Sequence, residues 1–241
     1  MRRLCLSLLC ILLMVPLRAQ WAAPGVLVAS GLAVHYLGHD AIELPLRNYV
    51  QMDLRDGGTL PYHDIGSYVQ YVPSAMHLSL GLAGCRARMP FMDRVVESSI
   101  AHLSALCLSR IPKYIFHSQR PDGGDFKSFP SGHSILAFTG AELTRMDYGN
   151  WWGAGAYAMS VFVGLDRIYG DRHWLGDVLA GAGLGILSAH IGACLAGPVK
   201  NWLGLPEFNW DGAGSRKVQL TVAAVSDPVS GTICPALSLA F

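Results

Sequence analysis

The middle of the chain carries cations and histidines at spacings that suit phosphate chemistry. Lys113 is followed after six residues by Arg120-Pro121, and Arg167 lies five residues before His173. Arginine offers forked donors that match phosphate oxygens, and lysine adds a point charge. Three such cations on otherwise charge-poor segments, bracketing two histidines, indicate a site for a phosphate dianion.

The second histidine lies in the tetrapeptide Pro130-Ser131-Gly132-His133, at the start of an expected helix. Ser131 is a good N-cap, and Gly132 lets the backbone approach a ligand closely. The free N–H groups of a first helical turn, together with the helix dipole, form an anion site. An ordinary capped helix carrying a chance histidine has the same local sequence, so this tetrapeptide alone does not establish a site.

His173 and Asp177 are four residues apart, which places them on one face of a helix. A carboxylate bonded to one ring nitrogen fixes the tautomer and makes the other nitrogen a better nucleophile. The alternatives are a structural His–Asp contact or half of a metal site. A metal site needs at least one further ligand, which this spacing does not supply.

Taken together, the three clusters resemble the signature of the type 2 phosphatidic acid phosphatase and vanadium haloperoxidase superfamily. That signature is Lys, six residues, Arg-Pro; then Pro-Ser-Gly-His; then Arg, five residues, His, three residues, Asp. Each of its positions is filled between Lys113 and Asp177. One departure is Asp166, where the family usually has serine, and we expect it to alter the hydrogen bonding of Arg167.

The resemblance implies a mechanism without a metal or other cofactor. His173 would attack phosphorus, held by Asp177, and a protonated His133 would donate to the leaving oxygen and later activate water. The remaining positions would bind the phosphoryl oxygens and stabilise charge in transit: Lys113, Arg120, Ser131, Gly132 and Arg167. His173 must be neutral while His133 must be protonated. We therefore expect the reaction rate to have a bell-shaped pH profile with a mildly acidic to neutral optimum.

The resemblance also implies an all-α bundle of about five or six helices in which the clusters converge at one end. The patterns predict helices over 65–83, 131–145, 151–169 and 174–195. A further helix is expected to begin at Pro90, and Pro112 kinks or ends that helix. Gly181, Gly183 and Gly185 predict close helix packing. Alternating apolar residues in the tail predict a short β-hairpin. His117 and Lys127, between the clusters, are interpreted as solvated loop residues.

The composition predicts buried helices, membrane contact or both, and the N-terminus predicts that the body of the protein lies outside the cytoplasm. Hydrophobic residues make up 51% and charged residues 15% of 241 positions, with a mean hydropathy of +0.33. Arg2-Arg3 followed by an apolar run predicts a signal peptide over 1–19, an uncleaved anchor helix being the alternative. A helical phosphatase domain over 20–205 and a tail over 206–241 would follow. No basic tract suggests nucleic-acid binding.

These features predict a metal-independent phosphatase of the bacterial cell envelope. The substrate would be a lipid carrying a phosphate monoester or a diphosphate, such as lipid A, undecaprenyl diphosphate or phosphatidic acid. The enzyme would be periplasmic, or in the inner membrane with its active site facing the periplasm. The alternatives are a soluble periplasmic acid phosphatase of broad specificity, a vanadate-dependent haloperoxidase, which shares the site, and a non-enzymatic protein with a decayed site.

Overall fold

The computed structural model describes residues 19–205, 219–226 and 233–240. The expected signal peptide lies outside the described residues except at Ala19, where the first described helix begins. The loops that would join the expected tail strands to the domain and to each other also lie outside them.

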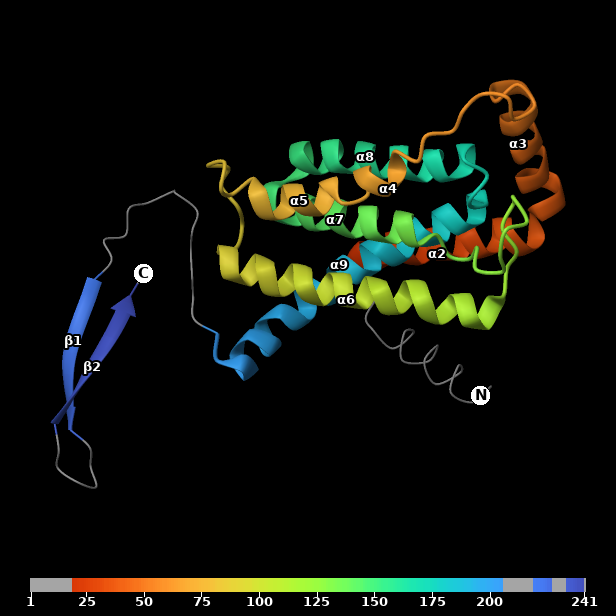
Figure 1. Ribbon diagram of the computed structural model, residues 1–241. Coiled ribbons are helices and arrows are strands. Elements are labelled where there is room, and N and C mark those ends of the chain that lie inside the picture. Colours follow the sequence, from red (N-terminus) through yellow and green to blue (C-terminus); the bar gives the residue numbers. More distant parts are fainter. Residues whose placement is uncertain (1–18, 206–218, 227–232, 241) are drawn as a thin grey trace.

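The described part of the domain is a helical bundle, which confirms the predicted fold class (Figure 1). Its long helices are α2 (Ala19–Leu37), α6 (Phe91–Phe116), α7 (Gly132–Tyr148), α8 (Asn150–Tyr169) and α9 (Leu175–Leu203). Shorter helical segments supplement the five or six helices expected: η1 (His39–Glu43), α3 (Leu44–Asn48), η2 (Tyr49–Leu54), α4 (Gly66–Val69) and α5 (Val72–Ser79).

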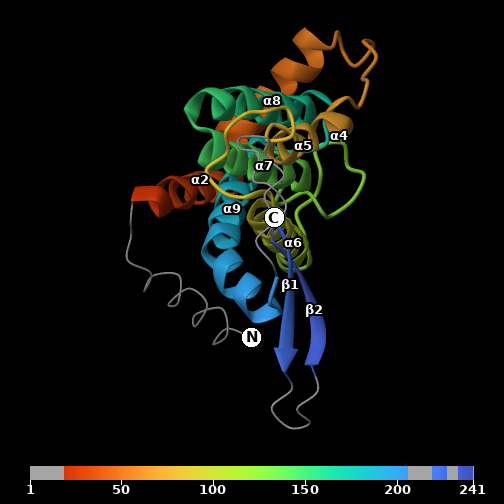
Figure 2. The same cartoon turned by 90° about the vertical axis from the view of Figure 1, so that its left-hand side faces the viewer.

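Helix α9 is the centre of the bundle and packs against α2, α6 and α7 (Figure 2). Its glycines permit this, because a Cβ added at Gly183 would lie 2.7 Å from the Pro24 carbonyl of α2. On the α7 side, a Cβ at Gly185 would lie 2.5 Å from the Ile135 carbonyl. The predicted role of these glycines in close helix packing is confirmed.

The predicted end of the last long helix was wrong, and of the two outcomes left open at Pro112, a kink or an end, the helix does not end there. Helix α6 continues through Pro112 to Phe116, and α9 continues through Gly197-Pro198 to Leu203. A proline inside a helix removes one backbone hydrogen bond and clashes with the carbonyl four residues earlier, which is costly but does not forbid helical geometry on both sides. Figure 1 shows the last turns of α9 projecting beyond the bundle.

Two strands are described in the tail, β1 (Gln219–Ser226) and β2 (Ile233–Ala240). They pair antiparallel, with Gln219 opposite Ala240 and Ser226 opposite Ile233. The turn between them lies outside the described residues, so the expected hairpin stays a prediction.

Candidate active site

The predicted site residues lie at the ends of four long helices, or in the loops beside these ends, which meet at one end of the bundle (Figure 1). Lys113 lies in the last turn of α6, and His133 lies in the first turn of α7. Arg167 lies in the last turn of α8, and Asp177 in the first turn of α9. Because successive helices alternate in direction, motifs far apart in the sequence arrive at the same place.

A cavity of about 630 Å³ opens at this end, and five of the predicted residues line it: Lys113, Arg120, Gly132, His133 and His173. The other three, Ser131, Arg167 and Asp177, are buried and do not line the cavity. Two cations that we did not assign also contribute to its wall. Arg110 lies one helical turn before Lys113, and Lys127, interpreted as a solvated loop residue, is both exposed and part of the lining.

His173 and Asp177 adopt the arrangement expected of a nucleophile and its orienting carboxylate. Nδ1 of His173 lies 3.4 Å from Oδ2 of Asp177, which is within ion-pair distance, and this Nδ1 makes no hydrogen bond. The same Asp177 oxygen accepts the backbone N–H of Trp174 at 2.9 Å and the hydroxyl of Ser128. Burial lowers the pKa of His173, against the opposing effect of Asp177, so the neutral imidazole needed for attack is favoured.

Lys113 is held by the loop that precedes α7. Its ammonium group donates to the carbonyl of Lys127 at 2.7 Å and to that of Pro130 at 2.8 Å. Burial, together with the nearby charge of Arg120, lowers the pKa of Lys113 to about 8. The side chain therefore still carries its charge at neutral pH, and it fixes the loop that leads into the N-terminal end of α7.

The start of α7 is built as an N-terminal cap packed tightly on α6. The Ser131 hydroxyl oxygen accepts the backbone N–H of Ser134 at 3.4 Å, so its side chain serves the helix and does not face the cavity. A Cβ added at Gly132 would lie 2.8 Å from the hydroxyl of Ser109 on α6. No other described atom lies that close, and Gly132 and His133 bring the first turn of α7 to the cavity wall.

Arg120 follows α6 and is held by an acidic turn. Its Nε donates to Oδ1 of Asp125 at 2.8 Å, and the backbone N–H of Arg120 donates to the carbonyl of the same residue at 2.9 Å. The guanidinium is partly exposed, with 23% of the side chain accessible. An incoming phosphate can therefore reach Arg120 without breaking a buried ion pair.

Arg167 lies behind His133 and already has acidic partners. Its Nη2 donates to Asp64 and Asp166, and its Nη1 lies 3.4 Å from Nε2 of His133. Hydrogen bonds from Arg167 hold the pKa of Asp64 down at about 2, although partial burial opposes this. The charge of Arg167 is thus partly neutralised before any substrate binds.

His133 lies between this arginine and helix α4. Its Nε2 is 3.0 Å from the hydroxyl of Ser67. Burial lowers the pKa of His133 to about 4, with further contributions from the charges of Arg167 and His173. His133 is therefore neutral in the free protein near pH 7, and a bound dianion is needed to favour its protonated form.

Asp166, the departure from the family pattern, ties a loop to α8. Its Oδ2 accepts the hydroxyl of Tyr62 at 2.9 Å and the backbone N–H of Gly66 at 3.2 Å, besides the bond from Arg167. The expectation that Asp166 alters the hydrogen bonding of Arg167 is confirmed. No sequence pattern linked Tyr62, Asp64 or Ser67 to a site more than sixty residues away.

We predict that Asp166→Ser lowers the free energy of unfolding by about 1–3 kcal/mol, because Tyr62, Gly66 and Arg167 lose a shared buried acceptor. Urea denaturation at neutral pH measures this. Asp53→Ser is the matched control, since Asp53 lies exposed on η2, and it should leave the midpoint unchanged. Equal midpoints for the two variants would show that Asp166 does not stabilise this loop.

A second layer behind Asp177 comes from α2 and η1, two segments in which the sequence predicted no site residue. Nδ1 of His35 lies 3.6 Å from Oδ1 of Asp177 and 3.4 Å from Glu43. The buried Glu43 in turn accepts the backbone N–H of Gly176 at 2.8 Å. This layer holds the first turn of α9, and with it the orientation of Asp177 toward His173.

Comparison with known proteins gives one family match. Residues 98–199 match the PAP2 superfamily. The chain is 34% identical over 145 residues to lipid A 1-phosphatase of Porphyromonas gingivalis, covering 58% of this chain and 33% of that protein. It is 30% identical over 117 residues to undecaprenyl-diphosphatase of Sulfolobus acidocaldarius, covering 42% of this chain and 55% of that protein.

The chain thus spans between a third and just over half of the length of these relatives. Among solved structures, it is similar to the crystal structure of Aquifex aeolicus LpxE, with a TM-score of 0.42 and 22% identity. That alignment covers 64% of this chain and 96% of the other.

Proposed function

We propose that this chain, which belongs to the PAP2 superfamily, is a phosphatase that hydrolyses a phosphate monoester or diphosphate on an envelope lipid. One observation carries the proposal. A single cavity is lined by His133, His173 and the cations Lys113 and Arg120, so that a phosphoryl group bound there lies between the two histidines. Arg110 and Lys127 add positive charge at the same wall.

In the first step, Nε2 of His173 attacks phosphorus while the bond from phosphorus to the leaving oxygen breaks. Asp177 holds Nδ1 and stabilises the positive charge that forms on the ring. His133, protonated once the dianion is bound, gives its proton to the leaving oxygen. In the second step, neutral His133 takes a proton from water, whose oxygen attacks the phosphohistidine and releases phosphate and neutral His173.

The cations supply the positive charge that the transferring phosphoryl group needs, so the reaction requires no metal in the cavity. Lys113 and Arg120 reach the cavity directly. Arg167 lies behind His133, where its Nη1 has long contacts of 3.4 Å each to Ser67 and His133. When substrate binds, this Nη1 would leave these contacts and donate to a phosphoryl oxygen. Ser131 contributes through the cap that fixes the first-turn backbone of α7.

A lipid fits the surface around the cavity better than a small soluble ester. Leu106, Leu136 and Tyr71 line the same cavity as the cations, and Leu106 is 52% exposed. The same helix, α6, also exposes Leu103, Ile111 and Ile115. The names of the relatives, lipid A 1-phosphatase and undecaprenyl-diphosphatase, point to lipid phosphates of the envelope.

The helices are compatible with membrane association, whether or not one of them crosses the bilayer. Among the described residues, α9 is long and apolar enough to cross a bilayer, but just over half of its most apolar window is buried inside the bundle. A second candidate is the bent pair Trp21–Leu37 and His39–Leu54, whose halves meet at 88°. We place the protein at the envelope membrane with the cavity facing the periplasm.

Phosphate release from a panel of lipid phosphates by the purified protein tests the proposal. The panel comprises lipid A, undecaprenyl diphosphate, phosphatidic acid and a water-soluble phosphate monoester. We expect at least one lipid to be hydrolysed with a higher kcat/KM than the soluble ester. A preference for the soluble ester, with the mature protein released from membranes by a salt wash alone, would favour the soluble acid phosphatase instead.

We predict that vanadate inhibits phosphate release and that EDTA does not reduce kcat at 25 °C. Vanadate takes the five-coordinate geometry of the transferring phosphoryl group and would bind covalently to His173 among the cations. Initial rates with each addition measure both effects. Activity that disappears in EDTA and returns with added zinc or magnesium would instead support a metal held by His173 and Asp177 in the cavity.

A further inference from the structure

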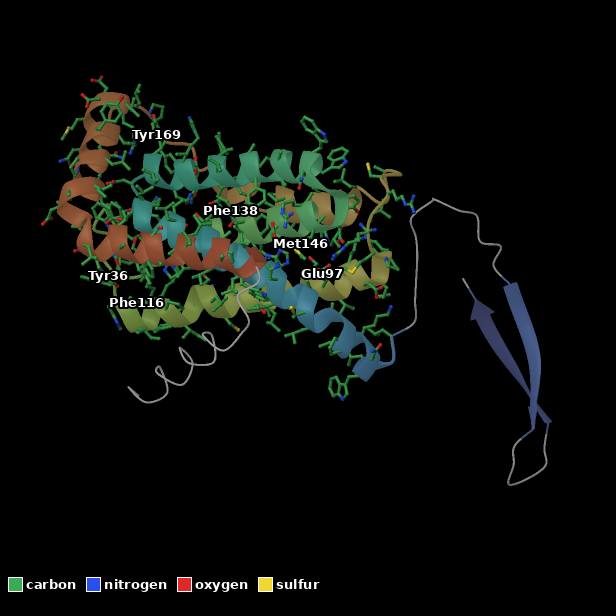
Figure 3. All side chains as sticks on the ribbon, turned by 180° about the vertical axis from the view of Figure 1, so that it is seen from behind. Tyr36, Glu97, Phe116, Phe138, Met146 and Tyr169 are labelled. Atoms are coloured by element: carbon green, nitrogen blue, oxygen red, sulfur yellow. The ribbon has the colours of Figure 1, made fainter. Side chains whose placement is uncertain are left out.

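A second cluster of buried titratable residues lies at the other end of the bundle. It consists of His77 on α5, Glu97 on α6 and Asp147 on α7. His77 and Glu97 are fully buried, and Asp147 is 4% exposed. In Figure 3, Glu97 and the neighbour of Asp147, Met146, lie close together, far from Phe116 at the end of α6 that carries the cavity.

Several polar atoms of this cluster lack a hydrogen-bond partner. Nε2 of His77 is 2.7 Å from Oδ2 of Asp147. Both carboxylate oxygens of Glu97, Nδ1 of His77 and Oδ1 of Asp147 are buried without a hydrogen bond. A buried carboxylate without a partner costs several kcal/mol, and native proteins rarely retain one unless something is bound.

Two arginines lie beside this cluster. Nε of Arg88 lies 3.5 Å from Oδ1 of Asp147, and Nη1 of Arg94 donates to the carbonyl of His77 at 3.0 Å. Burial, with the adjacent charge of Asp147, raises the pKa of Glu97 to about 8. Glu97 therefore holds a proton at neutral pH, which a bound metal ion would displace.

We propose that His77, Glu97 and Asp147 bind one divalent transition-metal ion, for which Zn²⁺ is the best match. One ligand atom from each residue lies within 4.8 Å of the others. Zinc takes imidazole nitrogen and carboxylate oxygen at about 2.0–2.2 Å, which separates neighbouring ligands by about 3.3 Å in a tetrahedron. The 2.7 Å between His77 and Asp147 needs to widen by only about 0.6 Å to admit the ion between them.

The ion would have a structural role. It would join three helices, and in doing so anchor the short α5 to the longer α6 and α7. The residues just before α5, Gln70 and Tyr71, line the catalytic cavity, so α5 connects the metal end of the bundle to the cavity. Two carboxylates balance the charge of the ion, and water supplies a fourth ligand.

Metal content and thermal stability test the proposal on the full chain, purified without a polyhistidine tag and dialysed against zinc and then against metal-free buffer. We expect about one zinc per wild-type chain by mass spectrometry of the metal. Removing it with a strong chelator should lower Tm by at least about 4 °C, since an ion that binds only the folded state stabilises it. kcat at 25 °C should not change, because the cluster does not touch the cavity.

The decisive variant is Glu97→Gln, with Asp93→Asn as its matched control. Both changes convert a carboxylate to an amide on the first turns of α6, but Asp93 pairs with Lys200 at 2.5 Å and lies outside the cluster. Glu97→Gln should lose the zinc and have a lower Tm than the zinc-loaded wild type, whereas Asp93→Asn should keep the zinc. His77→Asn should likewise lose it.

Without a bound ion the expected signs reverse. Replacing a buried, unpartnered carboxyl beside another carboxylate by an amide would then maintain or raise Tm. Wild-type protein that holds less than about a tenth of an equivalent of zinc after loading, or Glu97→Gln protein that holds as much as wild type, would overturn the proposal. The wild-type measurement decides the question even if a variant fails to fold, and neither outcome bears on the phosphohistidine.

Discussion

His173→Ala is expected to abolish phosphate release, with kcat lower by on the order of 10⁴- to 10⁶-fold, the range seen when an enzyme loses its nucleophile. Among the residues that line the cavity, His173 alone has a carboxylate on one ring nitrogen, at 3.4 Å. Alanine removes the attacking atom and leaves the cations in place. Substrate should therefore still bind, and its KM should change much less than kcat.

The fold must survive for this result to be informative. His173 precedes α9 and makes no hydrogen bond through Nδ1, so we expect the variant to keep its circular dichroism and most of its Tm. His63→Ala is the matched control, because His63 is exposed on the segment that leads to the site. Normal turnover by folded His173→Ala protein would exclude the proposed mechanism.

His133→Ala is expected to slow phosphoenzyme formation by on the order of 10²- to 10⁴-fold for a lipid phosphate, the usual contribution of a general acid. The loss should shrink for a nitrophenyl phosphate, since that leaving oxygen is stable without a proton. Rapid-quench measurement of the first turnover isolates this step. That separation matters because His133 should also assist the later attack by water.

The comparison between leaving groups distinguishes two roles for His133. A general acid contributes more as the leaving oxygen becomes more basic, whereas a group that only binds phosphate contributes equally to both substrates. Equal losses on the good and the poor leaving group would therefore reassign His133 to phosphate binding, beside Arg167.

The structure also shifts the expected pH profile. A pKa of about 4 for His133 means that the protonated acid is lost in the free protein as pH rises through that value. The pH dependence of kcat/KM depends on the protonation of groups in the free enzyme. We therefore expect kcat/KM to begin falling at a lower pH than the mildly acidic to neutral optimum expected from sequence. The bound dianion stabilises protonated His133, so the corresponding limb of kcat should lie at higher pH.

Much of the site followed from sequence because its residues lie in compact motifs on helices. The four-residue step from His173 to Asp177 places both on one helix face whatever surrounds them, and Ser131 caps α7 through a local contact. Five of the eight predicted residues line the cavity: Lys113, Arg120, Gly132, His133 and His173. Their catalytic roles stay predictions until the variants are measured.

The remaining features depend on contacts between segments with no shared pattern. Asp64 and Tyr62 reach Arg167 across about a hundred residues, and His35 reaches Asp177 from α2. The buried cluster of His77, Glu97 and Asp147 forms because three helices pack together. Periodicity identifies which face of a helix is apolar, but it does not identify which polar residue on another helix will meet it.

Trapping the phosphoenzyme tests the central claim most directly. Wild-type protein and His173→Ala protein are each mixed with a substrate labelled at the phosphoryl group and quenched within one turnover. We predict labelled phosphate on the wild-type protein that is stable in alkali and labile in acid, that maps to the peptide containing His173, and that is absent from His173→Ala. Phosphate release by wild-type protein with no trapped label, or with label elsewhere, would contradict a phosphohistidine on His173.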